Sequence, residues 1–160
     1  MDDRVREMGP LPVAVLGTIF LCACLFFLIR FLIGQYGRSR RTGAIDEMEG
    51  HDFEYFCAEL LEKRGFLEVE VTRGSGDYGV DILAEKEGVT YAIQCKRYTA
   101  PVGVEAIQQV YAGRDYYDRM VGAVMTNQYF TASAVEAAKH LKILLWDRGY
   151  LDSMLEEGKR

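Results

Sequence analysis

The sequence lacks the cysteine patterns that mark a disulfide framework or a zinc site. It has four cysteines in 160 residues and no CxxC pair. Cys22 and Cys24 lie inside a long apolar run, whereas Cys57 and Cys95 occur singly at predicted core positions. Internal repeats and low-complexity tracts are also absent. This length leaves room for one domain of about 100–150 residues plus an appendage, which excludes a large multidomain enzyme.

Charge is absent from the run between Leu11 and Ile29, which is 19 residues long. A helix needs about 20 apolar residues to cross the hydrocarbon core of a bilayer, so the run predicts a transmembrane helix. The alternative is a cleaved signal peptide, since "LCAC" resembles a lipoprotein cleavage site at Cys24. The acidic residues before the run and the apolar residues after Cys24 favour an uncleaved anchor over residues 1–33, inserted through residues 11–29.

Basic residues near the two ends of this span predict its orientation. Two arginines precede the span and four follow it: Arg4 and Arg6, then Arg30, Arg38, Arg40 and Arg41. The positive-inside rule therefore predicts a single-pass protein of the cell membrane whose C-terminal part is cytoplasmic.

The sequence after the anchor also lacks a basic excess. From Ala44 onward there are 13 Lys and Arg residues against 21 Asp and Glu residues, a formal net charge of −8. Domains that bind phosphates are more often basic. Nucleic-acid binding is not excluded, because a site that collects carboxylates brings its positive charge with a bound divalent metal.

The remaining sequence predicts a linker followed by one α/β domain. Residues 34–49 are rich in Gly, Arg and Ser and predict a flexible tether. Residues 50–160 predict a mixed β-sheet flanked by helices. The expected elements, in order, are a helix at 51–66, strands at 67–72, 80–86 and 89–98, a helix at 103–117, a strand at 122–126, a helix at 131–142, a strand at 143–147 and a helix at 150–157.

Two of these strands form a predicted hairpin whose register follows from its turn. If Glu87 and Gly88 are a two-residue loop, Lys86 pairs with Val89, and Asp81 lies opposite Gln94. Opposed residues of an antiparallel pair point to the same side, with Cβ atoms roughly 4.5–5.5 Å apart. Lys96, two residues beyond Gln94, shares that side.

One face thus collects Asp81, the amide of Gln94 and the ammonium of Lys96. Hydrolysis of a phosphodiester needs oxygen ligands for Mg²⁺, a group that orients or deprotonates water, and positive charge near the transition state. Glu54, at the border of the apolar stripe of the first helix, can add a second acid to this face. On spacing alone, an Asp and a Lys across two strands also fit a surface ion pair.

These residues resemble the Mrr-like restriction endonuclease domain of the PD-(D/E)xK nuclease superfamily. The resemblance covers nearly all of residues 50–155 and rests on "HDFEYFCAELLEKRGF", "GSGDYGVDILAE", "YAIQCKRY", "VMTNQYFTASA" and "LLWDRGYL". It implies a restriction-endonuclease-like fold and a Mg²⁺-dependent DNA endonuclease, in which Mn²⁺ can replace Mg²⁺. Asp81 is then the central metal-binding carboxylate and Lys96 the catalytic lysine.

The resemblance also implies roles for other residues. Gln94 stands where many superfamily members have Glu or Asp, and Glu54 matches the helix glutamate of the group. The metal would then be held by Asp81, Glu54, Gln94 and the backbone carbonyl of Cys95.

Three further residues are candidates for contacting DNA. Ser75 and Gly76 belong to a glycine-rich loop that resembles the corresponding loop of archaeal Holliday-junction resolvases and offers N–H groups to a phosphate. Asn127 either contacts DNA near a helix N-terminus or braces the loop after its strand.

The sequence therefore predicts a membrane-anchored DNA endonuclease. The alternative is a membrane-tethered DNA-binding or interaction module that keeps the nuclease fold without catalysis. Cleavage of both strands would need a homodimer or two successive nicks. The sequence contains no separate DNA-reading domain of the kind found in full-length Mrr-type enzymes, so it does not specify the DNA substrate.

Overall fold

The computed structural model describes residues 11–73, 76 and 78–157; the side chains of residues 11–14, 16, 34–42 and 157 lie outside this description. The chain divides into two compact units, Met1–Arg41 and Thr42–Arg160. Helix α1 (Leu11–Glu47) supplies the described part of the first unit, and its last residues belong to the second.

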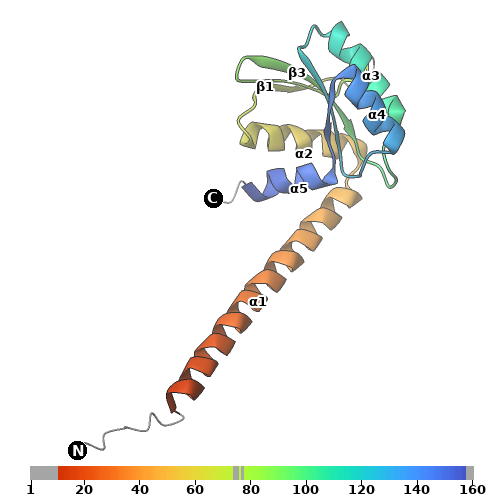
Figure 1. The fold of residues 1–160 in the computed structure, drawn as a ribbon. Helices are drawn as coiled ribbons and strands as arrows, with labels where there is room; N and C mark the ends of the chain where they lie inside the picture. The colour runs from red at the N-terminus through yellow and green to blue at the C-terminus, as the bar shows by residue number, and fades with distance from the viewer. Residues whose placement is uncertain (1–10, 74–75, 77, 158–160) are drawn as a thin grey trace, which may run out of the picture. The chain divides into compact units, whose positions relative to one another are not determined.

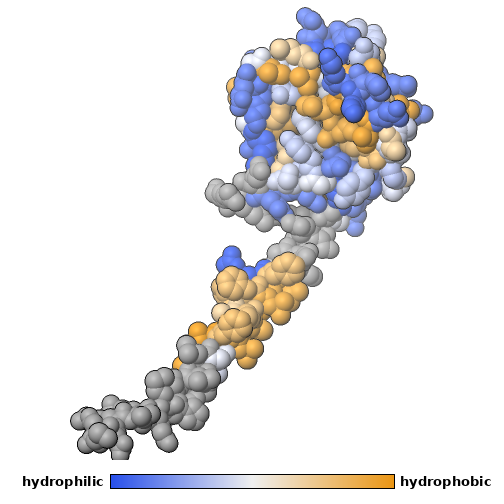
Figure 2. Space-filling view, in the orientation of Figure 1, coloured by the Kyte–Doolittle hydropathy of each residue, from blue (hydrophilic) through white to orange (hydrophobic). Residues whose placement is uncertain are grey.

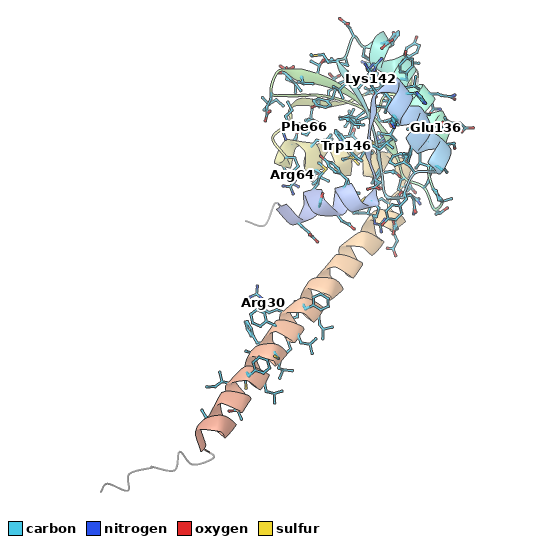
Figure 3. The ribbon with its side chains drawn as sticks, in the orientation of Figure 1. Arg30, Arg64, Phe66, Glu136, Lys142 and Trp146 are labelled. Atoms are coloured by element: carbon cyan, nitrogen blue, oxygen red, sulfur yellow. The ribbon has the colours of Figure 1, made fainter. Side chains whose placement is uncertain are left out.

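The described side chains of α1 are largely apolar and exposed, as the orange surface of this helix in Figure 2 shows. The guanidinium of Arg30, labelled in Figure 3, lies 6.0 Å from the ring centroid of Phe26. Over the side chains that the structure describes, no helix has both the length and the apolar character required to cross a membrane. The predicted span over residues 11–29 includes five residues outside those side chains, and Arg4 and Arg6 lie outside the described residues.

A five-stranded sheet forms the centre of the second unit (Figure 1). Its strands lie in chain order: β1 (Leu67–Val71), β2 (Ile82–Lys86), β3 (Val89–Lys96), β4 (Val121–Thr126) and β5 (Ile143–Trp146). The first three strands pair antiparallel, whereas β3, β4 and β5 pair parallel. The predicted mixed sheet and the predicted order of helices and strands are therefore confirmed.

The turn between β2 and β3 has the predicted register. Lys86 pairs with Val89 and Leu83 with Ala92. The two turn residues have φ values of 54° at Glu87 and 78° at Gly88. Positive φ at both central positions is typical of the tight hairpin turn whose twist matches that of the strands.

Two helical layers cover the sheet (Figure 1). Helices α2 (Gly50–Lys63) and α5 (Arg148–Glu157) pack on one face. Phe66 and Trp146, labelled in Figure 3, meet in that core with ring centroids 6.0 Å apart. Helices α3 (Val104–Tyr116) and α4 (Ala132–Leu141) pack on the other face around Ile107 and Val124.

The end of α1 differs from the prediction. A flexible linker is expected over residues 34–49, but the structure is helical up to Glu47. Arg and Gln are good helix formers, and the last turn is fixed by tertiary contacts that composition does not reveal. Ile45 is buried in the core beside α2 and α5, and Asp46 forms an ion pair with Arg148 at 2.7 Å.

Two glycines bring the chain before β2 against helix α3. A Cβ at Gly113 would lie 2.4 Å from Cγ2 of Val80 and 2.6 Å from the carbonyl oxygen of Tyr78. A Cβ at Gly79 would lie 2.7 Å from Cβ of Gln109. Residues 78–80, which lead into Asp81, therefore fit against α3 only without these side chains.

Gly113→Ala is expected to lower the free energy of unfolding by about 1–3 kcal/mol, because the new methyl group overlaps the Tyr78 carbonyl. Urea denaturation followed by the fluorescence of Trp146, the only tryptophan, measures the change. Gly50→Ala is the control, since a methyl group on that helical glycine would have no atom within 4 Å. Equal stability of both variants would mean that the loop moves away from α3 at no cost.

Candidate active site

The buried polar side chains of the described residues gather at one edge of the sheet. They are Asp81, Gln94, Thr126 and Asn127. Asp81 immediately precedes β2, Gln94 lies near the end of β3, and the other two are the last residue of β4 and its successor. Buried polar groups are costly unless they are hydrogen-bonded, so four of them at one edge of the sheet indicate a candidate functional site.

Asp81 is held from two sides by the end of β3. Gln94 Nε2 donates a hydrogen bond to Asp81 Oδ2, and the backbone N–H of Cys95 donates to the same oxygen at 2.6 Å. The backbone N–H of Asp81 donates to the carbonyl of Ile93 at 2.8 Å. The predicted opposition of Asp81 and Gln94 thus brings the two side chains into direct contact.

The electrostatics of Asp81 leave its negative charge poorly compensated. Burial raises the pKa of Asp81 to about 6, the hydrogen bond from Cys95 lowers this pKa, and the negative charge of Glu54 raises it. The positive charge of Lys96 acts in the opposite direction to Glu54. The carboxylate is therefore in an environment where an additional cation would stabilise its charged form.

Glu54 and Lys96 approach this carboxylate from different elements. Glu54 is in the first turns of α2, its side chain is 21% exposed, and its Oε2 lies 2.9 Å from Nδ1 of His51. Lys96 ends β3 and is half-buried. The charges of both residues act on Asp81, which agrees with the predicted grouping of Glu54, Asp81, Gln94 and Lys96.

The donor set fits a hard divalent cation. The side-chain oxygen of Gln94 is buried and has no hydrogen-bond partner among the described residues. It belongs to the same amide whose nitrogen contacts Asp81. A buried carboxylate and an unsatisfied amide oxygen are the ligand types that Mg²⁺ and Mn²⁺ prefer.

Cys95 contributes its backbone rather than its thiol to this edge. Its side chain is buried in the core beside α2 and α5. Hydrogen bonding with Cys57 and burial raise the pKa of the Cys95 thiol well above its usual range, so the thiol stays neutral. In the described part of the chain, no group of three or more His, Cys, Asp and Glu side chains is arranged to hold a metal. The predicted set of metal ligands differs from such groups because it includes the side-chain amide of Gln94 and the backbone carbonyl of Cys95.

The three residues predicted to contact DNA, Ser75, Gly76 and Asn127, differ in their exposure and in their contacts. Ser75 lies outside the described residues, and Gly76 is exposed with a φ of 78°. Asn127 is buried, and its side chain is engaged by the protein: Oδ1 accepts from the N–H of Tyr98 and Nδ2 donates to the Tyr98 carbonyl, both at 2.9 Å. These contacts brace the loop after β3, whereas the prediction is bracing of the loop after the strand of Asn127 itself, β4.

An ion pair that no sequence pattern indicates supports Asn127. Asn127 Nδ2 donates to Oδ1 of Asp46 at 2.7 Å, and Arg148 donates to both carboxylate oxygens of Asp46, at 2.7 and 2.8 Å. Asp46 and Arg148 are 102 residues apart in sequence. The end of α1 and the start of α5 therefore both hold the loop that follows Lys96.

Thr126 is a further residue that the sequence does not single out. Its hydroxyl donates to the carbonyl of Lys96 at 2.7 Å and accepts from the N–H of Gln128 at 3.1 Å. Thr126 pairs directly with Lys96 across the parallel strands. The one signal in the sequence is a polar residue that ends the buried stretch "GAVMT", beside the strand that carries the lysine.

The sequence of this unit matches a known family of nucleases. The family model Mrr_cat, described as restriction endonuclease, matches residues 45–155. The protein belongs to this restriction endonuclease family, and the predicted Mrr-like resemblance is confirmed. A comparison with curated protein sequences finds no match.

Solved structures share the fold at low sequence identity. A protein of unknown function, AF1548, is 23% identical with a TM-score of 0.59, over 68% of this chain and 66% of its own. The DNA modification-dependent restriction endonuclease AspBHI is 15% identical with a TM-score of 0.59, over 77% of this chain and 36% of its own. The MspJI restriction endonuclease, in complex with a 27-mer oligonucleotide, is 19% identical with a TM-score of 0.53, over 75% of this chain and 30% of its own. This chain thus spans about a third of the length of the two restriction enzymes.

Asp46→Asn is expected to destabilise the protein at pH 7 by about 1 kcal/mol, since it removes the charge paired with Arg148. Arg148 holds the pKa of Asp46 below its usual range. A lowered carboxyl pKa contributes stability above the usual value of about 3.9, and this contribution is lost as the pH falls through the lowered pKa. The difference from the unmodified protein should therefore shrink on acidification.

Urea denaturation at pH 7 and at pH 3 measures this difference. Asp118→Asn, which changes an exposed carboxylate, is the control. A destabilisation by Asp46→Asn that stays the same at both pH values would contradict a charge-dependent role.

Proposed function

We propose that the protein is a Mg²⁺-dependent endodeoxyribonuclease that hydrolyses phosphodiester bonds. The observation that carries this proposal is the buried carboxylate of Asp81, in contact with Gln94 and subject to the charges of Glu54 and Lys96. Membership of the restriction endonuclease family supports the same reaction class.

Asp81 and Glu54 are the proposed anionic metal ligands, and Gln94 Oε1 and the Cys95 carbonyl are the proposed neutral ones. When bound, the divalent cation supplies charge neutralisation at the phosphate and acidifies coordinated water. The hydrogen bonds from Gln94 and Cys95 fix the orientation of the Asp81 carboxylate. Mn²⁺ has similar ligand preferences and is expected to replace Mg²⁺.

Lys96 is the proposed catalytic cation. Its ammonium can orient the attacking water or stabilise negative charge that develops on the phosphate oxygens. Thr126 holds the Lys96 carbonyl, and Asn127 holds both backbone groups of Tyr98 two residues later. These contacts restrict the strand end from which the lysine projects.

DNA is the proposed substrate, because MspJI, which shares the fold, is described in complex with an oligonucleotide. One such site cuts one strand, so cleavage of both strands would require a homodimer or two successive nicks. Ser75 and Gly76 remain proposed phosphate contacts of the loop before Asp81.

We further propose that α1 anchors the nuclease in the cell membrane, with the second unit on the cytoplasmic side. Support comes from the uncharged run between Leu11 and Ile29 and from the exposure of its apolar side chains, such as Phe20 at 72% and Phe27 at 71%. Large apolar side chains with such exposure are expected to be covered by lipid or by protein.

Cleavage of supercoiled plasmid by the full chain in mild detergent tests the nuclease proposal. Nicking is expected with Mg²⁺ or Mn²⁺ and not with EDTA. Asp81→Asn and Lys96→Met should each lower the rate about 10²-fold or more, because the first removes a charged metal ligand and the second removes positive charge near the phosphate.

Asp118→Asn and Lys139→Met are the matched controls, since both change exposed charges on other elements. Binding of the plasmid without nicking by either metal would reject catalysis and favour a DNA-binding module. Absence of both binding and nicking would reject DNA as the ligand.

Membrane insertion predicts that the full chain stays with phosphatidylcholine vesicles after an alkaline wash. The double variant Leu21→Arg, Phe27→Arg should be released, since each arginine in a spanning helix costs about 2.5–3.5 kcal/mol. The control carries the same two changes at Tyr55 and Tyr150, which are exposed in the second unit. Release of the unmodified chain by the wash would contradict the anchor.

A further inference from the structure

The chain that leads into Asp81 carries a tyrosine in an unfavourable backbone conformation. Tyr78 has a φ of 50° and is followed by Gly79 at 79°. A residue with a side chain in the left-handed region costs about 1–2 kcal/mol, so other contacts must maintain it. The close packing of residues 78–80 against α3, at Gly79 and Gly113, supplies those contacts.

The ring of Tyr78 is stacked on the ring of Tyr116, at the end of α3. The centroids are 3.8 Å apart and the planes meet at 24°. The two rings therefore lie face to face. The interaction with the Tyr78 side chain raises the pKa of the Tyr116 hydroxyl.

A third tyrosine supports this pair from the protein side. Tyr117 meets Tyr116 edge to face, with centroids 5.0 Å apart and an interplanar angle of 84°. Tyr117 itself packs against the buried cluster of Val80, Leu83 and Ala92. The stacked pair is thus connected to the core beneath the β2–β3 hairpin.

Despite this support, the two stacked rings remain open to solvent. Tyr78 is 56% exposed and Tyr116 is 59% exposed. In a stack of two rings, one face of each ring is covered by the other, so the exposed area includes outer π-faces. A stacked pair of exposed aromatic rings is suited to extend the stack by one more flat ring.

The stacked pair is close to the proposed catalytic carboxylate. Tyr78 precedes Asp81 by three residues, which limits the distance between their Cα atoms to about 11 Å. The backbone that carries the tyrosine pair therefore lies near the backbone of the proposed metal site.

We propose that Tyr78 and Tyr116 form a stacking platform for one unpaired nucleobase beside the cleaved phosphate. This inference rests on the proposed nuclease function and specifies its substrate class. In a paired duplex both faces of a base are covered by its neighbours, whereas a base in a flap, bulge or single strand can stack on an aromatic side chain. The preferred substrate is therefore DNA with an unpaired nucleotide near the cleavage site.

The charge of the second unit makes this contribution important. The net charge of −8 from Ala44 onward opposes binding through phosphates alone. Base stacking does not depend on net charge and changes affinity about 5- to 150-fold per base. Stacking can thus direct an acidic nuclease toward unpaired DNA and away from intact duplex.

The test uses the full chain in mild detergent with Ca²⁺ in place of Mg²⁺, so that binding can be measured apart from cleavage. The probe is a short DNA duplex with one bulged 2-aminopurine, compared with the same strand fully paired. The unmodified protein is expected to bind the bulged probe more tightly and to quench its fluorescence by stacking.

Tyr116→Leu removes the π-face at an exposed position and should weaken binding of the bulged probe about 5- to 150-fold, with paired DNA unaffected. Tyr116→Phe keeps the ring and should retain binding and quenching. Tyr150→Leu is the matched control, because Tyr150 of helix α5 is an exposed tyrosine stacked on Trp146 of strand β5. Circular dichroism verifies that the variants are folded.

Equal binding of the two probes by the unmodified protein would overturn the platform. So would a loss for Tyr116→Leu that is the same for both probes, since that result indicates a structural role. Plasmid nicking with Mg²⁺ distinguishes the two levels of the proposal. Nicking without the bulge preference rejects only the platform, whereas neither binding nor nicking of DNA rejects the nuclease as well.

Discussion

The two-residue turn at Glu87 and Gly88 determines where the polar groups of the candidate site lie. Its length fixes the pairing of β2 with β3, and that pairing places Asp81 opposite Gln94. A slip of one residue would turn one of the two side chains to the other face of the sheet. The buried contact between carboxylate and amide therefore depends on a solvent-exposed turn at the far end of the hairpin.

The parallel half of the sheet completes the same edge by a different route. Pairing of β3 with β4 requires helix α3 to cross the sheet, and it brings Thr126 beside Lys96. Asn127 then reaches the loop after β3 and the end of α1 through Asp46. Local turn chemistry sets the first part of the site, whereas long-range packing sets the second.

This division explains what the sequence can predict. Strand alternation and hairpin length are local rules, so the sheet, the helix order and the approach of Asp81 to Gln94 follow from the residues. The ion pair of Asp46 and Arg148 joins segments 102 residues apart, and no periodic pattern indicates such a contact. The helical end of α1 escapes prediction for the same reason, because burial of Ile45 opposes the flexibility that the composition of residues 34–49 indicates. The family resemblance supplies roles that geometry alone leaves open, such as that of Lys96.

The neutral side chain at position 94 has a consequence for how Asp81 exchanges protons. Two buried carboxylates in direct contact would share a proton and titrate in two coupled steps that belong to the pair. Gln94 instead donates a hydrogen bond and adds no charge, so Asp81 titrates without a carboxylate in contact with it. The negative charge of Glu54 still adds repulsion at Asp81. The amide thus removes one negative charge from the ligand set, and it leaves Asp81 without the shared proton of a contacting carboxylate pair.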